Sequence, residues 1–280
     1  MAERIQTRFE MIRKVYKNLV DNGLDDVKER REMVIEKIAV KDLGQELPET
    51  KETAIHKFFE LKIRSHKTRA IIQADHAVGY LGVRDMVEKI SSKLEATSLI
   101  AKKPRSYVEV ARKRGFGNNT KIRSTSARAA MWWAYDKAVA VLNWRDKDGT
   151  LKKPVYRLCL NGVDDKPGYE YDIVIAKDFK PADIEVLDKF RELVSEKMGS
   201  EYKIVLAGAG TNNARDNSGF KSISHFRYIP ENDRDRHHPA FGENFQTFQV
   251  GIVKSLRENQ VTRKLVIDAL SYAMKEIQND

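Results

Sequence analysis

The chain changes character over residues 154–207, where three apolar runs with strand-like spacing interrupt a sequence that otherwise has helical periodicity. The runs cover residues 155–160, 169–175 and 202–207. A Gly- and Pro-containing segment of the kind found in hairpins joins the first two, and a helical pattern joins the second to the third. We therefore expect an α+β fold with one small, mainly antiparallel sheet flanked by helices.

A further strand is expected at residues 107–111. Counted from there, the elements run strand, helix, strand, strand, helix, strand, which is the ferredoxin-like order. That fold serves many unrelated functions, so the order of elements by itself indicates no activity.

The first hundred residues are expected to form a helical region that precedes an α+β domain at 101–280. Apolar residues recur at helical spacing over 3–22, 25–43, 51–78 and 83–94. In the second part we expect helices over residues 126–143, 181–198 and 261–277, and a helical tail that already begins at residue 241. The helical region is also the surface that would take a protein partner.

Composition favours a polyanionic partner. The 280 residues include 51 Lys and Arg against 41 Asp and Glu, a net charge of +10, which attracts polyanions at long range. The single cysteine excludes a disulfide within the chain and fits a reducing compartment. Neither a leader-like segment nor an apolar run of membrane-spanning length is seen, so we expect a cytoplasmic protein without membrane contact.

A basic segment at residues 102–128 is the strongest local sign of nucleic-acid binding. It holds nine Lys and Arg against one acid, with aromatic residues interleaved and glycines and asparagines in its middle. Long cations bind phosphates, and exposed aromatic rings stack on bases. The alternative is a charged surface linker. The expected contacts are Lys102, Lys103, Arg105, Tyr107, Arg112, Lys113, Arg114, Phe116, Lys121 and Arg123.

A long polar stretch at residues 208–240 follows the third apolar run. Loops of this length are usually functional or disordered. Its Gly-rich start presents backbone N–H groups that favour anions, although it matches neither common phosphate-binding fingerprint. A plain flexible turn is the alternative. The residues expected to cradle a phosphate are Gly208, Gly210, Thr211, Asn212 and Arg215.

Carboxylates near the apolar runs indicate a second class of function, an enzyme that acts on nucleic acid or a nucleotide. Asp165 and Asp172 are the metal ligands expected for Mg²⁺, because paired carboxylates hold this ion in phosphoryl transfer. Aspartate is also common in turns for backbone reasons alone, which is the competing explanation. The catalytic residues expected in this alternative are Asp172, Glu201, Lys203 and His225.

Cys159 lies inside the first apolar run and shares a strand face with Arg157 and Asn161 if that strand is regular. We interpret it as a packed residue rather than a catalytic thiol. The function favoured by the sequence is therefore nucleic-acid binding with weak or no sequence specificity. A metal-dependent nuclease or nucleotidyl-transfer enzyme is the first alternative, and a protein-interaction module is the second.

Overall fold

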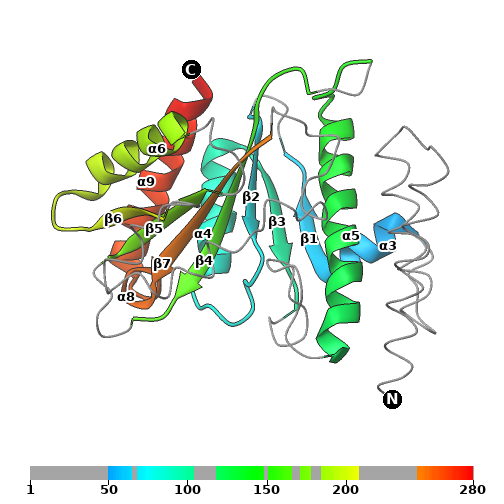
Figure 1. Ribbon diagram of the computed structural model, residues 1–280, viewed down its shortest axis with the longest axis horizontal. Coiled ribbons are helices and arrows are strands. Elements are labelled where there is room, and N and C mark those ends of the chain that lie inside the picture. Colours follow the sequence, from blue (N-terminus) through cyan, green and yellow to red (C-terminus); the bar gives the residue numbers. More distant parts are fainter. Residues whose placement is uncertain are drawn as a thin grey trace.

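The computed structural model describes residues 50–64, 68–103, 118–147, 151–165, 171–177, 184–207 and 245–279. They form one seven-stranded sheet between helices (Figure 1). The strands are β1 (Phe59–Lys62), β2 (Ala70–Ala74), β3 (Thr97–Ala101), β4 (Val155–Val163), β5 (Ile173–Lys177), β6 (Ile204–Ala207) and β7 (Phe245–Val253). The helices are α3 (Lys51–Phe58), α4 (Val83–Leu94), α5 (Asn118–Val141), α6 (Ile184–Met198), α8 (Lys254–Glu258) and α9 (Gln260–Asn279). None of these helices is both long and apolar enough to span a membrane.

The sheet is mixed, with a parallel centre. Its strand order is β1-β3-β2-β4-β7-β5-β6, and the neighbours β3, β2, β4 and β7 run parallel to one another. β1 is antiparallel to β3, β5 is antiparallel to β7, and β6 is parallel to β5. The prediction of a small, mainly antiparallel, ferredoxin-like sheet is therefore wrong.

β4 and β5, which were expected to pair as a hairpin, are not neighbours in the sheet, because β7 lies between them. β4 pairs with β7 in parallel over nine residue pairs, and β5 pairs with the other edge of β7. The sequence of β7 was expected to be helical, because Phe245, Phe248 and Ile252 also fit a helical spacing. In the structure Phe248, Val250 and Ile252 alternate onto one face of a strand, and all three are buried.

The helical pattern expected over residues 51–78 breaks after Phe58. Thr50 caps α3 by accepting the Thr53 N–H at 3.1 Å, and the chain then forms β1 and β2. All five residues of β2 are buried, and short buried strands resemble buried helix segments in periodicity. β1, β2 and β3 thus belong to the same sheet as the later strands, contrary to the expected helical N-terminal region. Residues 1–49 and the expected strand at 107–111 lie outside the described residues.

Several helices agree with the predictions. α4 spans the expected residues 83–94, α6 joins β5 to β6, and α9 includes the expected terminal helix. α5 includes the expected helix at 126–143 except its last two residues, and begins earlier. α4, α6 and α9 have a clear 3.6-residue period because each buries one side against the sheet or another helix.

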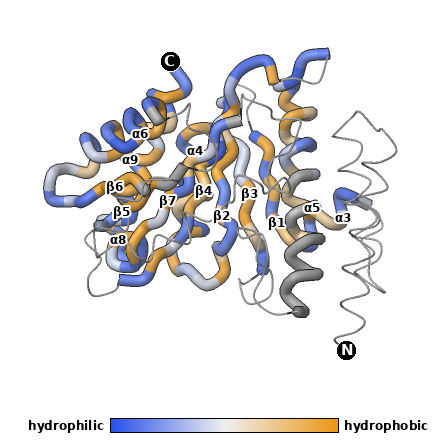
Figure 2. The backbone as a smooth tube through the Cα atoms, viewed as in Figure 1, coloured by the Kyte–Doolittle hydropathy of each residue, from blue (hydrophilic) through white to orange (hydrophobic). Residues whose placement is uncertain are grey.

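The two faces of the sheet are covered by different helices. One apolar cluster joins α4, α6 and α9 to a face that includes Ile72, Leu158 and Val250. A second cluster joins α3 and α5 to the opposite face through Ile71 and Leu99. Figure 2 shows hydrophobic and hydrophilic residues alternating along the helices, as expected for helices with one buried side. We call the side covered by α3 and α5 the α5 face.

The connections change direction between β2 and β4. From β2 the chain passes through α4 to β3 on one side, and from β3 it continues through α5 to β4 on the other side of β2. In open α/β sheets, ligands bind outside the carboxyl ends of the strands at such a switch point. The topology therefore predicts a ligand-binding site at the carboxyl ends of β2 and β4.

Gly162 near the end of β4 is a sensitive position for stability. A Cβ atom there would lie 2.5 Å from carbons of the Tyr80 ring, which cannot be accommodated without movement. We expect Gly162→Ala to lower the free energy of unfolding by about 1–3 kcal/mol, as overpacking does. Urea denaturation measures this. In a Tyr80→Gly background, which also removes the Tyr80 Cβ at 2.7 Å, the same substitution should cost clearly less, and an equal cost in both backgrounds would contradict the contact.

Candidate active site

Polar side chains occupy the α5 face at the centre of the sheet. The strand pairing places Ile71, Arg157 and Thr247 side by side across β2, β4 and β7. Two positions further along the same strands, and therefore on the same face, it places Gln73, Cys159 and Gln249 side by side. Asp75 directly follows β2, and Asn161 continues the same face of β4. With Tyr135 of α5, these residues form what we call the central polar cluster: Gln73, Asp75, Tyr135, Arg157, Cys159, Asn161, Thr247 and Gln249. None of them is more than 9% exposed.

A chain of hydrogen bonds connects most of this cluster. Arg157 Nη1 donates to Tyr135 Oη at 3.0 Å, and Tyr135 in turn donates to Gln73 Oε1. Gln73 Nε2 donates to Asp75 Oδ1 and contacts Met131 Sδ at 3.3 Å.

The chain reaches the other carboxylate oxygen of Asp75 through β4. Cys159 Sγ donates to Asp75 Oδ2 at 3.3 Å, and Asn161 Nδ2 lies 3.8 Å from the same sulfur. The buried cation and the buried anion are thus linked through neutral groups.

Tyr135 is held in its protonated form. Burial raises the pKa of its hydroxyl well above the ordinary value, and the nearby Arg157 guanidinium offsets this only in part. A protonated hydroxyl can donate to Gln73 while it accepts from Arg157, which is what the hydrogen-bond directions require. The direction of the pKa shift and the geometry therefore agree.

The cluster contrasts with the opposite face of the same strands. There, the positions between the polar residues are apolar: Ile72, Ala74, Leu158, Leu160, Phe248 and Val250. Central parallel strands covered on both faces usually read as continuous hydrophobic runs, because buried polar groups lose their hydration. The buried polar residues on the α5 face are therefore unusual for the core of a sheet that is covered on both faces.

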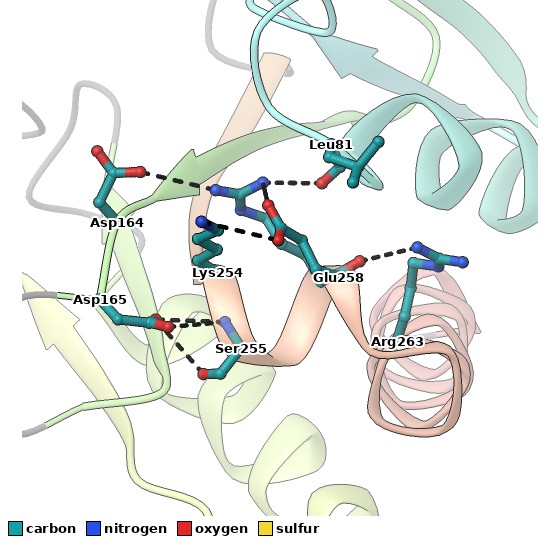
Figure 3. A network of polar contacts seen from close by, with 8 residues as sticks. Leu81, Asp164, Asp165, Lys254, Ser255, Glu258 and Arg263 are labelled. Atoms are coloured by element: carbon teal, nitrogen blue, oxygen red, sulfur yellow. Dashed lines mark hydrogen bonds and ion pairs between the residues drawn. The ribbon is translucent and has the colours of Figure 1, made fainter.

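The carboxyl edge of the parallel strands is held together by Arg257 of α8. Its guanidinium is 2% exposed, donates to the Leu81 carbonyl at 2.8 Å and lies 5.3 Å from the centre of the Tyr80 ring. Figure 3 shows the hydrogen bond to the Leu81 carbonyl. The loop after β2, which begins with Asp75, is thereby tied to α8.

Two aspartates expected to bind a metal lie at this same edge. The Asp165 carboxylate accepts from the Ser255 N–H at 3.0 Å, where α8 begins. The Asp172 carboxylate accepts from the Lys203 N–H at 2.8 Å, and the Asp172 N–H donates to the Lys203 carbonyl at 2.9 Å. Both carboxylates thus hold backbone groups in place.

The other residues expected to be catalytic are not brought into the cluster. Glu201 and Lys203 are exposed in the connection that leads into β6. His225 and the residues expected to cradle a phosphate, Gly208 to Arg215, lie outside the described residues.

The basic segment is described only in part. Lys102 Nζ donates to the His56 carbonyl at 2.6 Å, and so ties the end of β3 to α3. Lys103 has its own interactions within the protein. From Asn118 the chain forms α5, and the side chains of Lys121 and Arg123 are not described there. The other expected contacts, Arg105, Tyr107, Arg112, Lys113, Arg114 and Phe116, fall outside the described residues.

The described residues do not assemble a metal site. Among them, no three His, Cys, Asp or Glu side chains are gathered so that they could hold an ion. The cluster itself offers only the pair Asp75 and Cys159, which are hydrogen bonded to each other. A protein metal site normally uses at least three such ligands, so this donor set is not a complete one.

Comparison with known proteins gives structural likenesses only. No protein family model and no curated protein matches the sequence. Gene product Atu2144 from Agrobacterium tumefaciens matches with a TM-score of 0.49 and 11% identity, over 79% of this chain and 95% of that one. A bacteriophage poly-γ-glutamate hydrolase matches with a TM-score of 0.44 and 11% identity, over 85% and 92%. A zinc-free form named YNDL-apo matches with a TM-score of 0.41 and 11% identity, over 85% and 94%.

The predicted nucleic-acid-binding function requires correction. The described part of the basic segment contributes to the fold, through Lys102 and the backbone of α5. Two N-acetylmuramoyl-L-alanine amidases are also among the similar structures, with TM-scores of 0.38 and 0.37 and identities of 7% and 6%. The net charge of +10 was the main support for the prediction, and it says nothing about a site.

Most of the central polar cluster was missed from the sequence. The shared face of Arg157, Cys159 and Asn161 was recognised, and the strand pairing confirms it. The signal that could have revealed the rest is a polar residue at alternate positions of a buried strand, as in β2 and β7. In β7 this alternation was obscured by the competing helical spacing of its aromatic residues.

The first prediction from this geometry concerns the Tyr135 hydroxyl. Tyr135→Phe removes one partner from both Gln73 and Arg157, which stay buried. We expect the free energy of unfolding to fall by about 1–3 kcal/mol, measured by urea denaturation. Tyr272→Phe is the matched control, because this partly exposed ring keeps its contact with Lys197, and it should change stability by less than about 0.5 kcal/mol. Equal effects of the two substitutions would contradict the assigned hydrogen bonds.

The second prediction concerns alkaline pH. The unfolded chain releases the Tyr135 proton near pH 10, whereas the native protein retains it because burial raises this pKa. Above about pH 10 the unfolded state therefore binds fewer protons, and stability falls as the pH rises. Between pH 9 and 11 the wild type should lose more stability than Tyr135→Phe, by at most about 1.4 kcal/mol per pH unit. Parallel curves for the two proteins would show that Tyr135 ionises normally.

Proposed function

We propose that this chain is a hydrolytic enzyme and that the central polar cluster is its active site. The observation that supports this most strongly is the set of buried polar residues at the switch point between β2 and β4. Apolar residues of similar size would form a more stable core there, because buried ionised groups lose hydration that their partners only partly replace. Buried titratable groups at such a position are typical of functional sites.

Asp75 is the residue proposed to act as general base. Two of its roughly four acceptor positions are used by Gln73 and Cys159, which leaves positions for a proton from water. The carboxylate is 3% exposed, and the donors on both oxygens fix its orientation. A base that is held in place by neighbouring groups matches the general requirement for acid–base catalysis.

The proposed reaction is the hydrolysis of an amide bond. Asp75 takes a proton from water, the water oxygen forms a bond to the carbonyl carbon, and the carbon–nitrogen bond breaks. Asp75 then returns the proton to the leaving nitrogen. The Asn161 side-chain amide, next to Cys159 on the same face of β4, is the group proposed to donate to the carbonyl oxygen. All of these steps are assigned to side chains of the described residues.

The test is turnover of a panel of amides by the purified full-length chain. Poly-γ-glutamate and N-acetylmuramoyl-L-alanine peptides are the first substrates to try, because similar structures are named for acting on them. Each assay is run with added Zn²⁺, with Mg²⁺ and with a chelator, so that any metal requirement is measured directly.

The decisive variant is Asp75→Asn, which keeps the size of the side chain and removes its basicity. We expect kcat to fall by about 10²–10⁴-fold, the usual contribution of general acid–base catalysis. Asp268→Asn is the control, because this carboxylate lies on α9, paired with Lys93 at 2.6 Å and partly exposed. Wild-type turnover by a folded Asp75→Asn protein would refute the assignment of Asp75.

A further inference from the structure

The loop between Asp75 and Gly82 is fixed at its two ends and open in the middle. Asp75 lies in the central polar cluster, and Gly82 begins α4 with a φ of 87°. Between them, Val78 is 42% exposed, and a Cβ added at Gly79 would meet nothing within 4 Å. His76, next to Asp75, is 5% exposed and Ala77 packs against the apolar core, so up to Tyr80 the loop is exposed only at Val78 and Gly79 and is held again by contacts at its far end.

Arg257 makes those contacts with three consecutive residues. Its guanidinium lies 5.3 Å from the centre of the Tyr80 ring, and its Nη1 donates to the Leu81 carbonyl at 2.8 Å. Its own carbonyl faces Gly82 so closely that a Cβ there would collide with it. The same carbonyl accepts from Arg263 Nη1 at 3.0 Å, which connects the contact to α9 (Figure 3).

Tyr80 extends this contact to β4. Its ring lies against Gly162, the residue that follows Asn161 of the cluster. Arg257 thus holds one side of the Tyr80 ring and β4 holds another. The loop that carries Asp75 is aligned with the strand that carries Cys159 and Asn161.

Burial of this guanidinium is costly for a packing role alone. The side chain is 2% exposed, and its nearest carboxylates are Glu258 at 3.5 Å and Asp164 at 3.8 Å. The Asp164 side chain is itself 65% exposed, so its attraction is weakened by water. An apolar side chain would fill the same space with less desolvation.

We propose that Arg257 is a positioning residue: it holds the loop Asp75–Gly82 and thereby keeps the Asp75 carboxylate on Gln73 and Cys159. Its consequence for catalysis rests on the proposed function. Its structural consequence does not, because the hydrogen bond between Cys159 and Asp75 can be followed without any substrate.

Cys159 reports on this contact because it is the one cysteine of the chain. Displacement of Asp75 would remove the acceptor of the thiol and open the site to reagents. We expect Arg257→Met to raise the rate of Cys159 alkylation by iodoacetamide about tenfold under native conditions, as local opening does. Arg84→Met is the matched control: this arginine lies on α4, 46% exposed, and pairs with Glu60 and Glu88, and its loss should leave the rate unchanged.

Local release must be separated from general loss of stability. Met274→Ala removes a fully buried side chain of α9 that has no part in the loop, so it should speed alkylation and hydrogen exchange of the α9 amides together. Arg257→Met should speed alkylation and the exchange of amides 76–82, with little change in α9. In Arg257→Ala, added methylguanidinium should bring the alkylation rate back toward that of the wild type. If Arg257→Met does not fold, Arg257→Lys replaces it and should change the rate in the same direction.

The outcomes separate this inference from the proposed function. Unchanged alkylation in the Arg257 variants, or an increase matched by α9 exchange, would overturn the positioning role. With an active substrate, Arg257→Met should lower kcat about tenfold at similar KM, and methylguanidinium should rescue Arg257→Ala. Faster alkylation with unchanged kcat would overturn the catalytic part. If the wild type hydrolyses nothing, the proposed function fails, and alkylation still decides whether Arg257 holds Asp75.

Discussion

The desolvation of two charged side chains, Asp75 and Arg157, governs the centre of this protein. Arg157 lies on β4 and Asp75 directly follows β2, and both are less than 9% exposed. They are connected through Tyr135 and Gln73, whose hydroxyl and amide each donate in one direction and accept in the other. Removal of any one member would leave buried groups without their hydrogen-bond partners, which is why the cluster behaves as a unit.

This constraint also explains the position of α5. The helix contributes apolar residues such as Ala134 and Val139 to the second core cluster, and these residues alone would tolerate a shift along the sheet. Tyr135 removes that freedom, because its hydroxyl must meet both Gln73 and Arg157. Apolar packing thus decides which side of α5 faces the sheet, and hydrogen bonding decides its register.

The sequence was informative where one period dominated. α4, α6 and α9 have a single clear apolar side, and β4 was found from its run of alternating residues. The sequence was misleading where two readings fitted equally well, as in β2, which is buried on both faces, and in β7, whose aromatic residues also fit a helix. Pairing partners could not be inferred at all, because the partner of β4 is separated from it by about ninety positions of the chain.

The candidate site was hard to predict for a related reason. Gln73, Cys159 and Gln249 become neighbours only when β2, β4 and β7 lie side by side, and no short motif connects them. The sequence led instead to the prediction of a binding site in the basic segment at residues 102–128, because a cluster of lysine and arginine is visible in a linear sequence. The part of this basic segment that the structure describes ties α3 to β3 and leads into α5.

The insertion of β7 between β4 and β5 has a consequence for how the chain folds. Its pairing with β4 covers nine residues and closes a loop of about ninety, so this step carries a large entropic cost and is expected to come late. Until β7 is available, β4 and β5 each expose an unpaired edge, and the central polar cluster lacks Thr247 and Gln249. During synthesis the nascent chain would therefore hold two incomplete sheets whose unpaired strand edges can pair with other chains. Insertion of β7 would then join the two sheets into one.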